Sequence, residues 1–350
     1  MFSSSAQNGA EVVSLVSSTS SATIYYTLDG TTPTTASQIY QAPFLVSTNL
    51  TVKAIATATG YTTSAVNSFS QAPNVPPNTL VWSDEFTNST SANVQPDAKV
   101  WTYDTGNNGF GNNELETYCA AGSTTSPCDT TNPSAYSDPT GILHIVARQP
   151  SAGVYTSARM KTQGLFSFQY GRVEARMKLP EGQGMWPAFW LLGSNIATIN
   201  WPACGELDIM EHIDGSNPPI NGSPAAYDWV QSSIHGTGLN GGEPYHTSGF
   251  MATDWHTYGM IWTKGQIQFY VDDPSNIYET FNKSTQGGTW PFDDGPQFLL
   301  LNLAVGGSWP GNPDATTVFP SELQVDYVRI YGNVSLGTPT HTLDGSSLFS

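Results

Sequence analysis

Positive charge is scarce in this chain of 350 residues, which has 11 lysines and arginines against 28 aspartates and glutamates. The formal net charge of −17 argues against nucleic acid and against an anionic membrane surface, because both select for basic side chains. A neutral partner, such as an uncharged sugar polymer, remains open. Charged residues make up only 11% of the chain, and Ser, Thr, Asn and Gly take their place. This composition is typical of a β-rich protein with many turns.

Long apolar runs are also absent, so no transmembrane helix is predicted. The start, MFSSSAQNG, lacks the basic and apolar segments of a secretory signal. A chain whose signal has been removed would begin in this way, and we expect a secreted protein. Of the three cysteines, Cys119 and Cys128 bracket a short polar loop. A disulfide there would add about 2–3 kcal/mol and imply an oxidising compartment, and two free thiols are the alternative. Cys204 is interpreted as a small buried residue and not as a nucleophile.

A proline-rich stretch divides the chain. Residues 1–9 are predicted to be a disordered leader. Residues 10–71 contain short strand-like runs such as ATIYYTL and lack His, Cys and Trp, so they predict a small β-sandwich. QAPNVPPNT indicates a stiff linker at 72–79. All ten tryptophans follow it. A second domain is predicted at 80–332, with a tail at 333–350.

The second domain shows repeated strand-like runs and no amphipathic helix. Examples are LVWSDEF, GILHIVAR, AFWLLG, QFLLLNLAV and the hairpin HTYGMIWTKGQIQFYV. Many antiparallel strands with turns at regular intervals predict a β-sandwich or jelly roll. A sandwich with one concave sheet offers a cleft long enough for a polymer.

The stretch GELDIMEH places Glu206, Asp208 and Glu211 within six residues, separated by apolar residues that favour a strand. Strand alternation puts Glu206 and Asp208 on one face and turns Glu211 away. A β-bulge at Ile209–Met210 would bring Glu211 back to the same side. When carboxyl groups cluster, the pKa of at least one of them rises, because the group resists double ionisation. Glycoside hydrolases use a protonated carboxyl beside an ionised one for catalysis. A solvated acidic strand face is the alternative.

Three tryptophans surround this strand in sequence: Trp186 and Trp190 in GMWPAFWLLG, and Trp201 just before the acidic residues. Indole rings stack on the apolar faces of sugars without using charge. We expect Trp186 and Trp201 to contact substrate, and Trp190 to be at least partly buried.

Other candidates for substrate binding are polar residues in loops and strands, namely Asn112 and Asn113 in GFGNNELE, Arg159 in YTSARMKT, and His235 in SSIHG. Glu114 is expected to hold the first loop, although a plain turn would explain it nearly as well. His212, next to Glu211, is expected to face the opposite way and to be structural.

These motifs resemble glycoside hydrolase family 16, and the laminarinase-like endo-β-1,3-glucanases within it. The likeness rests on WPACGELDIME, WSDEF, GNNELE, the run from YTSARMKTQG to GMWPAFWLLG, and VDYVRIY, in that family's order. It implies an all-β, concanavalin-like jelly roll and a retaining double displacement. Glu206 would be the nucleophile, Glu211 the general acid and then base, and Asp208 would tune both. Residues 10–70 resemble the immunoglobulin-like module at the C-terminus of chitobiases, for which we favour a spacer role over sugar binding.

The resemblance also implies a structural calcium ion held by Glu85, Gly141 and Asp326. No cofactor is expected for catalysis. The extra residue Met210 indicates β-1,3-glucanases or agarases and carrageenases rather than lichenases, and the cleft, rich in tryptophan and poor in basic residues, favours a neutral β-glucan. We therefore expect a monomeric endo-β-1,3-glucanase. A mixed-linkage β-1,3-1,4-glucanase, a galactan hydrolase, or a non-catalytic carbohydrate-binding jelly roll are the alternatives.

Overall fold

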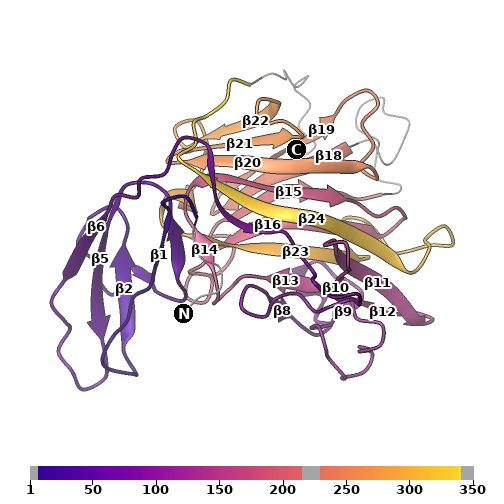
Figure 1. The fold of residues 1–350 in the computed structure, drawn as a ribbon, viewed down its shortest axis with the longest axis horizontal. Coiled ribbons are helices and arrows are strands. Elements are labelled where there is room, and N and C mark those ends of the chain that lie inside the picture. The colour runs from indigo at the N-terminus through magenta and orange to yellow at the C-terminus, as the bar shows by residue number, and fades with distance from the viewer. Residues whose placement is uncertain (1–6, 215–228, 340–350) are drawn as a thin grey trace.

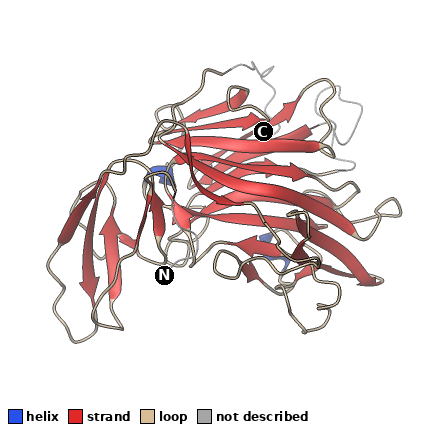
Figure 2. Cartoon of the chain, in the orientation of Figure 1, coloured by secondary structure: helices blue, strands red, loops and turns tan. Residues whose placement is uncertain are grey.

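The computed structural model describes residues 7–214 and 229–339, and these residues form an almost purely β protein (Figures 1 and 2). Two ten-stranded sheets and one four-stranded sheet contain all the strands. Within the described ranges the only helical segments are two 3-10 turns, η1 (Gly109–Gly111) and η2 (Pro291–Asp293). No helix among these residues is long and apolar enough to cross a membrane. The predicted all-β jelly-roll class is confirmed.

The first large sheet carries the acidic motif near its centre. Its strands follow the order β1 (Glu11–Val13), β4 (Phe44–Val46), β14 (Ser167–Phe168), β23 (Gln297–Val305), β16 (Met185–Gly193), β17 (Glu206–Glu211), β18 (Trp229–Gly236) and β19 (Leu239–His246). Two further strands lie beside β23, namely β13 (Arg159–Lys161) and β8 (Thr102–Asp104).

The second large sheet covers the inner face of the first. Its strands follow the order β22 (Ile277–Asn282), β21 (Gln266–Val271), β20 (Trp255–Thr263), β15 (Gly171–Lys178), β24 (Ser321–Gly332), β11 (Leu143–Ser151), β12 (Val154–Ser157) and β9 (Glu116–Tyr118), with β10 (Ala135–Ser137) on β11 and β7 (Thr79–Asp84) on β24. The predicted β20–β21 hairpin is present, and its turn uses Gly265 at φ +76°, a conformation that glycine adopts without strain.

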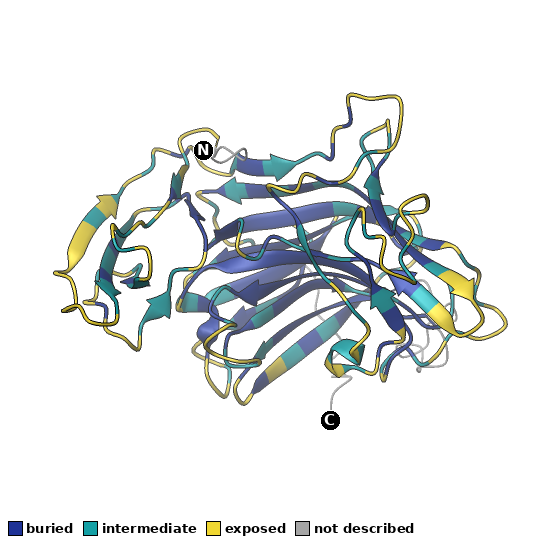
Figure 3. Cartoon of the chain, turned by 90° about the horizontal axis from the view of Figure 1, so that it is seen from below, coloured by how far each residue is buried: buried dark blue, intermediate teal, exposed yellow. Residues whose placement is uncertain are grey.

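Strand alternation divides each strand of the first sheet between two environments. On β16, Phe189 and Leu191 point into the core between the large sheets, while Ala188 and Trp190 point to the opposite face. All nine residues of β23 are buried, because apolar side chains cover both of its faces. Figure 3 shows the resulting pattern, with buried strands at the centre and exposed residues mainly in loops. The continuous apolar run QFLLLNLAV follows from this double burial.

The N-terminal module is joined to the first large sheet by strand pairing. Its own sheet contains β3 (Gln38–Ile39), β2 (Thr23–Thr27), β5 (Leu50–Thr57) and β6 (Asn67–Gln71). Its two remaining strands, β1 and β4, extend the first large sheet. β1 pairs with β4, and β4 pairs in parallel with β14, so that Ser167 lies opposite Phe44. Leu45 packs into the main core, whereas Phe44 and Val46 pack into the core of the module. The module is therefore built into the first large sheet and is not held by its linker alone.

Single residues of the segments predicted as linker, leader and tail contact the rest of the protein. Val75 of the linker is buried in the main core, and its carbonyl accepts a hydrogen bond from the Asn333 side chain at 2.9 Å. The amide of Gln7 donates to the carbonyl of Val81 at 2.8 Å. Gly337 exchanges two backbone hydrogen bonds with the Gln268 side chain, at 2.8 and 2.9 Å. The rest of the leader, 1–6, and of the tail, 340–350, lies outside the described residues.

The cysteines behave as the sequence predicted. Cys119 and Cys128 form a disulfide across the polar loop. Cys204 is a free, buried thiol, and burial raises its pKa to about 11. A thiol that stays protonated at neutral pH is a poor nucleophile, so Cys204 has a packing role.

Candidate active site

The acidic strand β17 contains the predicted bulge. Toward β16, Met210 lies opposite Phe189 and Asp208 lies opposite Trp190, which leaves Ile209 between them without a register partner. Toward β18, the register also shifts between Asp208 and Glu211. Ile209 and Met210 both pack into the core. The extra residue turns Glu211 to the same side as Glu206 and Asp208, and the three carboxyls share one cleft.

This cleft has a volume of about 320 Å³ on the outer face of the first sheet. Acidic, aromatic and amide side chains line it together with a few aliphatic ones: Phe110, Gly111, Asn112, Glu114, Arg159, Trp186, Ala188, Trp190, Leu192, Ile196, Trp201, Glu206, Asp208, Glu211, Asn302 and Ala304. Arg159 is the only basic residue in this set.

Neighbouring strands hold the carboxyls in place. The indole N–H of Trp186 donates to Glu211 Oε1 at 3.0 Å, and the hydroxyl of Ser233 donates to Glu211 Oε2 at 3.2 Å. The Nε2 atom of His235 lies 3.1 Å from Asp208 Oδ2 and 3.9 Å from Glu206 Oε1. Glu211 is thus oriented from β16 and β18 at once, and His235 bridges the other two carboxyls.

Burial raises the pKa of all three carboxyls. The pKa of Glu211 rises to about 8 and that of Asp208 to about 7, while that of Glu206 lies well above its usual range. The negative charge of Asp208 adds to the effect of burial on Glu206 and Glu211. The group therefore retains protons at neutral pH, which allows one carboxyl to act as an acid beside an ionised neighbour.

All three predicted tryptophans line the cleft, at different depths. Trp190 is buried in the floor, where its indole N–H donates to Asn302 Oδ1 at 2.7 Å and the Arg159 guanidinium lies 4.6 Å above its ring. Trp186 stands next to Glu211. Trp201 is 56% exposed at the rim, with its ring 6.3 Å from that of His235. The two more accessible rings offer flat apolar surfaces to a sugar.

The polar candidates divide into two groups. Asn112 and Arg159 line the cleft, and Arg159 also pairs with Asp104 at 3.0 Å. Asn113 is not among the lining residues, because its side chain donates to Ser308 Oγ at 2.8 Å and ties two loops together. His212 is fully buried, with Nδ1 at 2.8 Å from the carbonyl oxygen of Trp229, in agreement with a structural role.

Sequence reasoning missed Asn302 and Trp309. Asn302 is the lone polar residue in the buried run QFLLLNLAV, and such an isolated amide was a usable signal. Trp309 follows that strand in GGSWPG and meets Trp186 edge to face, with ring centroids 5.4 Å apart. No local pattern separates Trp309 from a tryptophan in an ordinary turn.

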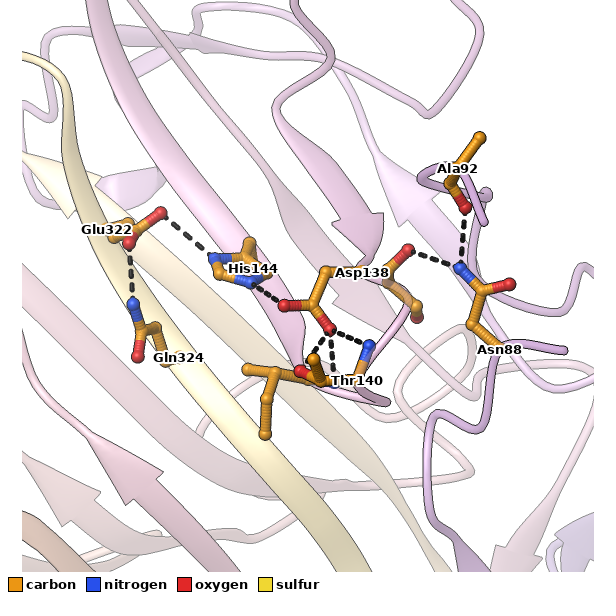
Figure 4. Close-up of polar contacts among 9 residues, drawn as sticks. Asn88, Ala92, Asp138, Thr140, His144, Glu322 and Gln324 are labelled. Carbon is orange, nitrogen blue, oxygen red and sulfur yellow. Dashed lines mark hydrogen bonds and ion pairs between the residues drawn. The ribbon is translucent and has the colours of Figure 1, made fainter. Parts of the chain in front are cut away.

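The residues expected to hold calcium have other partners. Glu85 forms two hydrogen bonds to the Arg329 guanidinium at 2.9 and 2.8 Å, and Asp326 pairs with Arg176 at 2.8 Å. Gly141 follows a turn in which Asp138 bonds to Thr140 and contacts His144 (Figure 4). With both carboxylates neutralised by arginine, these side chains do not form a set of free oxygen ligands. Calcium binding stays a prediction.

One group in the cleft has the geometry of a metal site. Ligand atoms of Glu206, Asp208 and His235 lie within 4.8 Å of one another. A cation there would engage two of the three clustered carboxyls and compete with their acid–base chemistry.

Comparison with known proteins agrees with the geometry. The model of glycosyl hydrolases family 16 matches residues 122–329, and that of the chitobiase/beta-hexosaminidase C-terminal domain matches residues 3–68. A beta-glucanase of Rhodothermus marinus is 39% identical over 267 residues, covering 72% of this chain and 84% of that protein.

Solved structures show the same relationship. The laminarinase catalytic domain of Thermotoga maritima aligns with a TM-score of 0.61 at 36% identity, over 74% of this chain and all of that one. The endo-beta-1,3-glucanase of Pyrococcus furiosus aligns with a TM-score of 0.59 at 37% identity, over 72% and 94% of the two chains. The chain belongs to glycosyl hydrolases family 16 and carries a chitobiase C-terminal-type domain before its jelly roll.

Proposed function

We propose that this protein is an endo-acting β-1,3-glucanase that cleaves a laminarin-type glucan with retention of configuration. The bulged strand carries the proposal, because it places Glu206 and Glu211 on one side of the cleft with Asp208 between them in sequence. The names of the relatives, a beta-glucanase, a laminarinase and an endo-beta-1,3-glucanase, support the substrate.

In the first step, the Glu206 carboxylate attacks the anomeric carbon and Glu211 donates its proton to the departing glycosidic oxygen. This leaves a covalent glycosyl–enzyme intermediate. In the second step, the Glu211 carboxylate takes a proton from water, the resulting nucleophile attacks the anomeric carbon, and Glu206 departs as a carboxylate. Trp186 and Ser233 hold both oxygens of Glu211 in place through each step.

The raised pKa of Glu211 fits its role, whereas that of Glu206 opposes the ionisation its role requires. A pKa of about 8 keeps Glu211 protonated at neutral pH, as a general acid requires. Glu206 must be ionised to attack. Positive charge that develops on the sugar ring in the transition state stabilises this form, and the contact with His235 favours it as well.

The lining of the cleft supports a neutral glucan over a sulfated galactan. Its one basic residue, Arg159, already pairs with Asp104 and stacks on Trp190, so little positive charge remains for sulfate groups. The disulfide and the polymeric substrate together support an extracellular location. One chain supplies the whole cleft, which supports action as a monomer.

Product analysis after incubation with laminarin, barley mixed-linkage glucan and agarose tests the proposal. We expect rapid release of short oligosaccharides from laminarin, with the β-anomer formed first. Glu206→Ala should abolish this release and leave binding to laminarin nearly intact. Cleavage of none of the three polymers would favour the carbohydrate-binding alternative, and an active Glu206→Ala variant would refute the assignment of the nucleophile.

A further inference from the structure

Glu114, which lines the cleft, and Glu116 form a buried pair of carboxyl groups. Glu116 is fully buried and Glu114 is 8% exposed. After burial, the nearby charge of Glu114 is the largest influence on the Glu116 carboxyl, whose buried Oε1 has no hydrogen-bond partner. Among the hydrogen bonds of the described residues, none brings a lysine or arginine to either group. Two buried neighbouring carboxyls resist double ionisation, so one member of the pair keeps a proton.

The partners of each group indicate where the proton lies. Glu114 accepts a hydrogen bond on each oxygen, from Asn112 Nδ2 at 3.1 Å and from the Tyr118 hydroxyl at 2.8 Å, as an ionised carboxylate does. The Oε2 atom of Glu116 accepts a hydrogen bond from the Val305 amide at 2.7 Å, whereas its Oε1 atom has no hydrogen-bond partner. A proton on Oε1 that donates to Glu114 satisfies both groups. Burial, with the charge of Glu114, raises the pKa of Glu116 to about 8.

A chain of hydrogen bonds connects this pair to the cleft. Tyr118 Oη accepts from Asn302 Nδ2 at 3.3 Å, and Asn302 Oδ1 accepts from the Trp190 indole at 2.7 Å. A second branch runs through Asn112, whose carbonyl accepts the Ser308 amide at 2.7 Å. The pair therefore fixes the cleft floor through one branch and the loop at its edge through the other.

We propose that Glu114 and Glu116 share one proton and act as a positioning pair that holds Asn112, Asn302 and Trp190 in place for the glucan. This inference rests on the proposed function, because it assigns these three residues to glucan binding. Tyr118 on β9 and the Val305 amide on β23 contact the pair, and the charge of Arg159 on β13 acts on Tyr118. When Glu116 loses its proton, two adjacent negative charges repel each other in a site with little water. Glu114 then moves away from Tyr118 and Asn112, so that Asn112, Asn302 and Trp190 are no longer held in one position.

The test measures binding without turnover. In a Glu206→Gln background, the dissociation constant of laminarihexaose is measured by calorimetry at about pH 6 and about pH 9.5. If the protein binds laminarihexaose only when the pair is protonated, a Glu116 pKa of about 8 leaves roughly 3% of the protein able to bind at the higher pH. The dissociation constant should then rise by up to about thirtyfold. Adding Glu116→Gln should flatten this rise, because an amide donates to Glu114 and still accepts from Val305 at both pH values.

Two further variants complete the design. Glu322→Gln removes one carboxylate near His144, away from the cleft, and should keep the pH dependence of the background. Tyr118→Phe cuts the branch to Asn302 and should weaken binding at about pH 6. The proposal is overturned if the curves with and without Glu116→Gln run parallel, or if Tyr118→Phe binds as tightly as the background. Wild-type protein that fails to cleave laminarin would refute the proposed function separately, since these binding curves do not depend on turnover.

Discussion

The indole N–H of Trp186 should set the alkaline limit of activity. It donates to Glu211 Oε1 at 3.0 Å and thereby favours the ionised carboxylate, which lowers the pKa of Glu211 against the larger opposing effect of burial. Trp186→Phe keeps an aromatic ring beside the cleft and removes the donor. The pKa of Glu211 should therefore rise above its present value of about 8.

The size of the change follows from the hydrogen bond. A hydrogen bond to a charged group contributes about 1.5–3 kcal/mol, and each pKa unit corresponds to about 1.4 kcal/mol, so complete loss would raise the pKa by about 1–2. Ser233 still donates to the other oxygen at 3.2 Å. We expect a change near the lower bound, with the alkaline midpoint about one pH unit higher.

The measurement is kcat at saturating laminarin between about pH 5 and pH 10, which keeps changes in affinity out of the profile. Ser233→Ala removes the second donor and should move the alkaline limb in the same direction. Trp255→Phe is the matched control, because that ring lies against Arg176 on the second large sheet. An alkaline limb that stays in place, or that moves to lower pH, in Trp186→Phe would refute the reasoning.

Three further predictions concern binding and stability. Arg159→Lys loses the planar guanidinium that lies 4.6 Å above the Trp190 ring, so KM for laminarin should rise about five- to tenfold with kcat little changed in steady-state kinetics. His144→Gln removes a ring that contacts both Asp138 and Glu322 (Figure 4). Burial alone would lower the pKa of His144, but the hydrogen bonds to these two carboxylates outweigh burial and raise it. The contribution of the protonated ring is present below about pH 6.5 and is lost as pH rises through the folded pKa, so the variant should lose more Tm at about pH 5.5 than at about pH 8.5. Leu45→Ala should cost about 2–4 kcal/mol and lower the Tm of the main calorimetric transition, because Leu45 lies in the main core, whereas Val46→Ala should mainly affect the module. Equal Tm losses at both pH values, or no effect of Leu45→Ala on the main transition, would contradict these two predictions.

Local sequence pattern was enough to predict the bulge in β17. Strand alternation alone sends Glu211 to the wrong face, so a cluster of three carboxyls required a bulge at Ile209–Met210, and the structure has it there. The hairpin at Lys264–Gly265 and the Cys119–Cys128 disulfide were equally accessible, because each depends on residues close in sequence.

Long-range packing was not accessible in this way. Asn302 reaches the cleft because β23 pairs with β16 more than a hundred residues earlier, and a single asparagine in an apolar run does not identify its partner. Val75 lies among prolines that indicate a linker, yet it is buried in the core of the following domain. Pattern-based reasoning describes what a segment can form, whereas the surface it packs against depends on the whole fold.

The pairing of β4 with β14 has a consequence for any study of the catalytic domain alone. Removing the module leaves the two residues of β14 at an open sheet edge without their backbone partners in β4. Such an edge can recruit another copy of the same domain and promote self-association. In the full chain, β4 of the module covers this edge. A loss of activity after its removal should therefore be interpreted together with the aggregation state of the truncated protein.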